Sequence, residues 1–106
     1  MTTFDKREEG FEQQFAHDEE LRFKATARRN KLLGLWVAGK VGLKGADAEA
    51  YAKSVVVANF EGDHDVFRKV RGDLDAKNVA GITDEQIRKT MIELLARSID
   101  EIKAGR

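Results

Sequence analysis

A long segment without any helix-breaking signal constrains the fold of this chain most strongly. From Phe4 to Val41 there is neither a proline nor a cluster of turn residues, and the whole chain contains no proline. A helix over these roughly 38 residues would be about 57 Å long, whereas the three later periodic segments, of about 14–21 residues, would span only about 20–32 Å. A bundle covers only the length of its shorter members. About half of the first segment must therefore project beyond the core or remain unstructured.

Clusters of Gly and polar residues separate the helical segments at residues 42–46, 60–64 and 77–83. The clearest helix start is a capping box, in which Thr83 caps the first turn and Gln86 reaches back to the cap. The sequence thus predicts an all-α fold, a four-helix bundle with a flexible N-terminal segment. The expected ranges are 1–18 for the flexible segment and 19–106 for the bundle, with helices at about 20–41, 46–59, 64–76 and 84–104.

The apolar residues of the first segment form two separate stripes. Phe4, Phe11 and Phe15 lie within about 40° of one another on a helical wheel, and the stripe that starts at Leu21 is rotated from them by roughly 80–120°. Residues 1–18 therefore do not extend the core-facing side, and they are too polar to fold alone. Such segments order on a partner. Two interpretations remain open from spacing alone: docking in an apolar groove of another protein, or folding back onto the bundle.

Composition excludes several classes of function. The chain has no Cys, which excludes disulfides, thiolate zinc sites and cysteine nucleophiles. No apolar run approaches the roughly 18 residues of a membrane span, and the N-terminus lacks the features of a signal peptide, so we expect a cytoplasmic protein without membrane insertion. The net charge of zero argues against a nucleic-acid partner.

The charges are nevertheless distributed unevenly. Residues 1–20 hold seven acidic and two basic residues, and residues 21–53 hold eight basic and two acidic ones. This split indicates two surfaces with different roles. The basic residues Lys24, Arg28, Arg29 and Lys31 are either a solvated face, with Glu20–Lys24 as an i,i+4 pair, or a site for phosphate or an acidic partner.

No motif supports an enzyme, a metal site or a required cofactor. The run from Gly34 to Val41 has P-loop spacing, but Val41 stands where the magnesium-binding Ser or Thr is needed, and the run ends a helix instead of following a strand. His64 lies between Asp63 and Asp65, which is more typical of a helix cap than of a metal site. We find no nucleophile–base arrangement.

One end of the bundle is a candidate nucleotide site. In an up-down-up-down arrangement the starts of the second and fourth helices lie at the same end, and helix N-termini attract anions. A side chain that could stack on a base and several cationic or polar groups belong to this end. These candidates are Trp36, Lys40, Lys44, Lys77 and Asn78.

Several runs of the chain resemble the zeta subunit of alphaproteobacterial ATP synthases, an ATPase inhibitor family. The most specific are Phe15-Ala16-His17-Asp18 and Ala27-Arg28-Arg29-Asn30-Lys31-Leu32-Leu33-Gly34, and the others are Phe4 to Glu8 and Asp65 to Lys69. The resemblance extends over essentially the whole chain. It implies a small four-helix protein that binds the catalytic head of ATP synthase and inhibits ATP hydrolysis through its N-terminal segment.

The resemblance also implies where contacts and ligands are to be expected. The inhibitory segment would act through Phe4, Asp5, Arg7, Glu8, Phe11 and Phe15. The protein would be peripheral to the inner membrane through ATP synthase. Binding of ADP or ATP is attributed to the family, so an adenine nucleotide is a candidate ligand. The alternative function is a helical module that binds adenine nucleotide and has little inhibitory action.

Overall fold

The computed structural model describes the backbone of residues 2–59 and 62–105, and the side chains of residues 19–59 and 62–105. Within these ranges every regular element of secondary structure is a helix. The helices are α1 (Thr2–Val41), α2 (Gly45–Val57), α3 (Asp63–Ala76) and α4 (Asp84–Lys103). The all-α fold with four helices is thus confirmed. The last three helices begin and end within two residues of the expected bounds.

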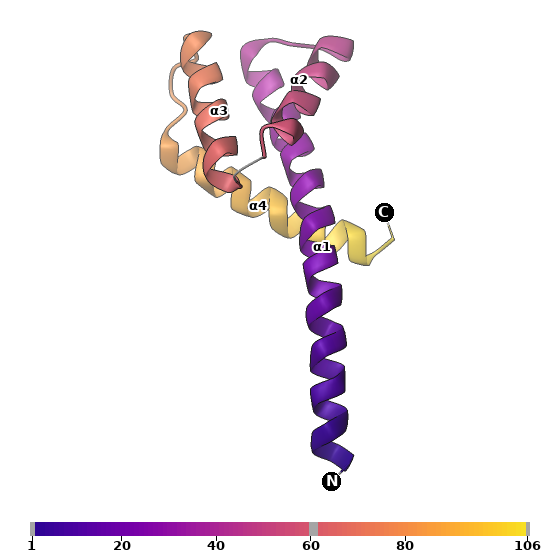
Figure 1. The fold of residues 1–106 in the computed structure, drawn as a ribbon. Helices are drawn as coiled ribbons and strands as arrows, with labels where there is room; N and C mark the ends of the chain where they lie inside the picture. Colours follow the sequence, from indigo (N-terminus) through magenta and orange to yellow (C-terminus); the bar gives the residue numbers. More distant parts are fainter. Residues whose placement is uncertain (1, 60–61, 106) are drawn as a thin grey trace.

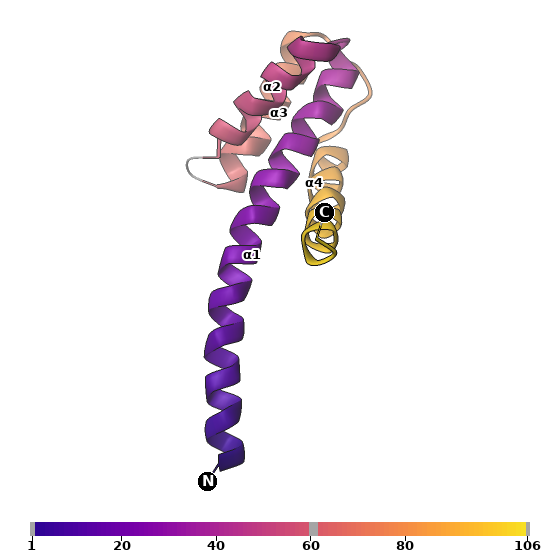
Figure 2. The ribbon, with the colours of Figure 1, turned by 90° about the vertical axis from the view of Figure 1, so that its right-hand side faces the viewer.

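Helix α1 dominates the shape of the molecule. It has 40 residues, which corresponds to about 60 Å, and the longest dimension of the molecule is 63 Å. Its C-terminal half packs on the other helices, whereas its N-terminal half extends away from them (Figures 1 and 2). The sequence placed a boundary near residue 19, but the helix is continuous there. The flexibility of residues 1–18 in solution stays a prediction.

The core lies where the second half of α1 packs against α2 and α4, with α3 closing the remaining side. Each helix contributes apolar residues about one turn apart, which places them on a single face. The buried core consists of Leu33, Val37, Val55, Val66, Val70, Leu74, Ile87 and Met91. The polar residues between them face solvent, so a helix as charged as α3 can still bury a continuous stripe.

Helices α1 and α2 approach each other closely because one of the contact residues is a glycine. A Cβ atom on Gly34 would lie only 2.6 Å from the Cα atom of Ala52 and 3.2 Å from Val55 Cγ2. Ala52 is itself fully buried. Gly34 therefore serves this helix contact and does not belong to a phosphate-binding loop.

Helix α4 does not follow the expected up-down-up-down path. In Figures 1 and 2 the connection after α3 runs back along that helix, and α4 then crosses α1 steeply. The start of α4 therefore lies apart from the start of α2. The prediction that both starts share one end is wrong.

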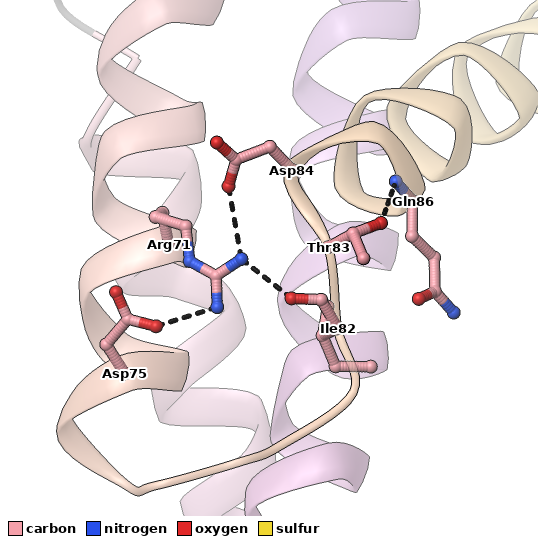
Figure 3. A network of polar contacts seen from close by, with 6 residues as sticks. All are labelled: Arg71, Asp75, Ile82, Thr83, Asp84 and Gln86. Carbon is pink, nitrogen blue, oxygen red and sulfur yellow. Dashed lines mark hydrogen bonds and ion pairs between the residues drawn. The ribbon is translucent and has the colours of Figure 1, made fainter.

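The side chain of Arg71 explains this path, because it holds the end of the loop against the middle of α3 (Figure 3). Its Nη1 atom donates to the carbonyl oxygen of Ile82 at 2.7 Å and to Asp84 Oδ1 at 3.1 Å. Its Nη2 atom donates to Asp75 at 2.7 Å. Beside this cluster the hydroxyl of Thr83 accepts from the backbone N–H of Gln86 at 3.0 Å, so the predicted cap of α4 is confirmed.

A second arginine joins α1 to the start of α3. Arg29 is only 2% exposed, and its Nη2 atom donates to Asp63 Oδ1 at 2.7 Å. Its Nε and Nη2 atoms also donate to Asn30 Oδ1, at 3.0 and 2.7 Å. The prediction that Arg29 shares a basic surface cluster is wrong, because Asp63 supplies a counter-charge that allows burial. The expected pair Glu20–Lys24 is confirmed, at 3.1 Å.

The close contact of α1 with α2 gives a stability prediction. Gly34→Ala should lower the free energy of unfolding by about 1–3 kcal/mol, because the cost of overpacking outweighs the roughly 1 kcal/mol that alanine gains in helix propensity. Gly39 is the matched control, since it lies on the same helix and a Cβ atom there would meet no atom of another helix within 4 Å. Gly39→Ala should raise stability by about 0.5–1 kcal/mol. Urea unfolding of both variants measures the difference; equal stability would contradict the packing argument.

The ion pair at the start of α3 gives a pH prediction. The guanidinium of Arg29 lowers the pKa of the Asp63 carboxyl, so the pair's stabilisation is complete above the unfolded-state pKa of about 3.9. It is lost as the pH falls through the lower folded-state pKa. Asp63→Asn should therefore be less stable than the parent by a constant amount from about pH 5 to pH 8. The gap should close at lower pH. Urea unfolding across this range tests it, and a gap that persists in acid would exclude the ion pair as its cause.

Candidate functional site

The predicted inhibitory residues belong to the projecting half of α1. The backbone of Phe4, Asp5, Arg7, Glu8, Phe11 and Phe15 is helical and lies away from α2, α3 and α4 (Figure 1). Their side chains lie outside the part of the chain whose side chains the structure describes. Their role in partner binding stays a prediction, and the structure adds that their backbone is continuous with a helix anchored in the core.

The predicted nucleotide residues gather at the opposite end of α1. The end of α1, the start of α2 and the end of α3 lie together there in both views (Figures 1 and 2). The Nζ atom of Lys40 lies 5.6 Å from the centre of the Trp36 ring, so the ammonium occupies one face of the ring predicted to stack a base. Lys44, Lys77 and Asn78 are exposed in the adjoining connections. The start of α4 does not lie at this end, although the sequence predicted that it would. Nucleotide binding stays a prediction.

Sequence reasoning missed a cavity between α1, α3 and α4. It has a volume of about 360 Å³ and combines cationic, aromatic and aliphatic side chains. Its lining residues are Arg29, Asp63, His64, Phe67, Arg88, Met91, Ile92 and Leu95. In the sequence, the spacing of Arg88 and Ile92 could have pointed to this surface, because it places them one turn apart on the outer side of α4. This spacing was not sufficient, because the cavity is lined by residues of three helices whose relative positions no periodicity shows.

Charge and stacking define the walls of this cavity. The guanidinium carbon of Arg88 lies 4.2 Å from the centre of the Phe67 ring, a cation–π contact. Buried Arg29, also in the lining, pairs with Asp63 and lowers the pKa of its carboxyl. The cavity can therefore accept a negatively charged group beside an apolar one.

Asp63, His64 and Asp65 do not form the helix cap that the sequence predicted for them. The N-cap of α3 is Gly62, with no side-chain hydrogen bond to the helix start, so the cap prediction for this run is wrong. The carboxylate of Asp63 instead accepts a hydrogen bond from Arg29.

Within the described residues no group of three or more His, Cys, Asp or Glu side chains could hold a metal ion. No helix in that part of the chain is long and apolar enough to cross a membrane.

Comparisons with known proteins assign the family. The chain is similar to a protein whose solution NMR structure has been solved: the two are 44% identical, the match covers 81% of this chain and 99% of the other, and the TM-score is 0.70. The comparison with curated proteins gives no match. The family model described as ATPase inhibitor subunit zeta matches residues 1–101. Because this match covers nearly all 106 residues, the chain belongs to the ATPase inhibitor subunit zeta family.

Proposed function

We propose that this protein is a non-enzymatic regulatory subunit that binds the catalytic head of ATP synthase and inhibits ATP hydrolysis through residues 1–18. The observation that carries the proposal is the N-terminal half of α1, which extends away from its own bundle (Figures 1 and 2). Membership of an ATPase inhibitor family supports it. Gly34, which has P-loop spacing in the sequence, serves a helix contact instead.

A helix wedged between moving subunits can stop a rotary enzyme without any chemistry. The wedge would be the face that carries Phe4, Phe11 and Phe15, and burying each aromatic side chain stabilises the complex by about 1.5–3 kcal/mol. Ordering the backbone of the segment opposes this, because each residue that becomes fixed loses conformational entropy. The three aromatic residues must therefore all be buried for docking to succeed.

Continuity of α1 reduces the cost of docking. The first turn of an isolated helix is unfavourable to form, because several residues must be fixed for one hydrogen bond. Residues 20–41 already belong to a helix packed in the core, so residues 2–18 only have to extend it. A bundle that supports its own wedge in this way needs a shorter apolar stripe than a detached peptide would.

The first test removes the aromatic stripe. Changing Phe11 and Phe15 together to Ala should abolish inhibition of ATP hydrolysis, because most of the apolar surface of the segment is lost. The melting temperature should equal that of the parent, since the segment lies outside the bundle. The readout is ATPase activity of the purified catalytic head against inhibitor concentration. Full inhibition by the double variant would show that another surface is responsible, and a lowered melting temperature would show that these residues pack on the bundle.

The second test changes the helical phase between the segment and the bundle. Two alanines inserted between Glu19 and Glu20 rotate the segment by about 200° relative to the core, whereas four rotate it by about 400°, which nearly restores the original direction. If α1 docks as one continuous helix, the two-residue insertion should weaken inhibition far more than the longer one. Titrations of both variants on the ATPase measure this. Equal inhibition by the two would mean that a flexible joint separates segment and bundle.

A further inference from the structure

The surface that α3 and α4 form around the cavity has the composition of a protein-binding site. Ile92 is 71% exposed, although the preceding residue, Met91, belongs to the core. Phe67 and Leu95 are half-buried beside it. Aromatic residues, Met and Arg are enriched in protein interfaces, and a large exposed apolar group beside a cavity is typical of an interaction surface. The fold itself does not require an isoleucine at position 92.

The charges of this surface are complementary to an acidic partner. Arg29 uses Nε and Nη2 for Asn30 and Asp63, and no residue with a described side chain accepts from its Nη1 atom. Arg88 stacks on Phe67, and none of the described carboxylates pairs with it. Among the residues whose side chains the structure describes, two guanidinium groups thus line the cavity and Asp63 supplies the one carboxylate in its lining. Arginine binds carboxylates through two parallel hydrogen bonds, so a carboxylate is the complementary group.

The apolar rim favours a protein segment over a small free anion. A cavity of about 360 Å³ is near the lower limit for small-molecule sites. A small anion bound against the guanidinium groups would leave the exposed side chain of Ile92 in water. A protein segment can insert a carboxylate and cover the rim at the same time.

We propose that this surface is a second docking site for the catalytic head, which places a carboxylate at Arg29 and Arg88 and an apolar side chain against Phe67 and Ile92. The inference rests on the proposed function. Arg29 and Phe15 lie on the same helix, about 21 Å apart along its axis. Two contacts on one continuous helix reinforce each other, because binding at one raises the effective concentration of the other. The bundle therefore anchors the inhibitory segment and contributes to affinity.

The test is Ile92→Glu in the full chain, with Val57→Glu as the matched control. A glutamate at position 92 lies one turn after Arg88 and would pair with it, so this variant removes the apolar contact and the available guanidinium together. Val57 is 64% exposed on α2 and is not among the residues that line the cavity. Binding to purified catalytic head should weaken at least about tenfold, which corresponds to 1.4 kcal/mol, for Ile92→Glu only. Both melting temperatures should stay at the parent value.

Each other outcome overturns the inference. If Ile92→Glu binds the head as tightly as the parent while the parent inhibits, the proposed function stands and the second site is excluded; a site for a small anion would give this result. If the variant changes the sedimentation of the free protein without affecting head binding, the surface joins two copies of this chain. If the parent does not bind the head at all, the proposed function fails first, and the inference fails with it.

Discussion

The difference in length between α1 and the other helices is the constraint on which the rest of the structure depends. Helix α1 has 40 residues, and α2, α3 and α4 have 13, 14 and 20. Three short helices can bury only about half of such a rod, so the other half has no partner within the bundle. The charge distribution agrees, because this half is acidic and carries few apolar residues. A stable core and an unpartnered extension on one continuous helix are the elements that an inhibitor acting as a wedge needs.

Two arginines position the short helices around this rod. Arg29 connects α1 to the start of α3 from a buried position, through Asp63. Arg71 connects the middle of α3 to the residues just before and at the start of α4. With both arginine contacts in place α4 crosses α1, and the cavity opens between α3, α4 and the guanidinium of Arg29.

Local sequence signals predicted where the helices begin and end. How the helices are arranged, and which charged residues are buried, depends on contacts between residues far apart in the sequence. The capping box at Thr83 and the apolar periodicity after it were sufficient to locate α4. The start of α4 is held against α3 by Arg71, whose partners there lie 11 and 13 residues away, and no periodic pattern encodes them. Arg29 looked like a surface residue because its neighbours in sequence are basic, whereas its counter-charge is 34 residues away. The cavity was missed for the same reason, since its walls come from three helices.

The central claim is that the projecting half of α1 binds the catalytic head as a helix. Amide hydrogen exchange of the full chain, measured with and without purified catalytic head, tests it directly. The account predicts that amides of residues 4–15 exchange fast in the free protein and much more slowly in the complex, because helix hydrogen bonds shielded by a partner open rarely. Unchanged exchange over residues 4–15 in a saturated complex, with slowed exchange confined to the bundle, would contradict it.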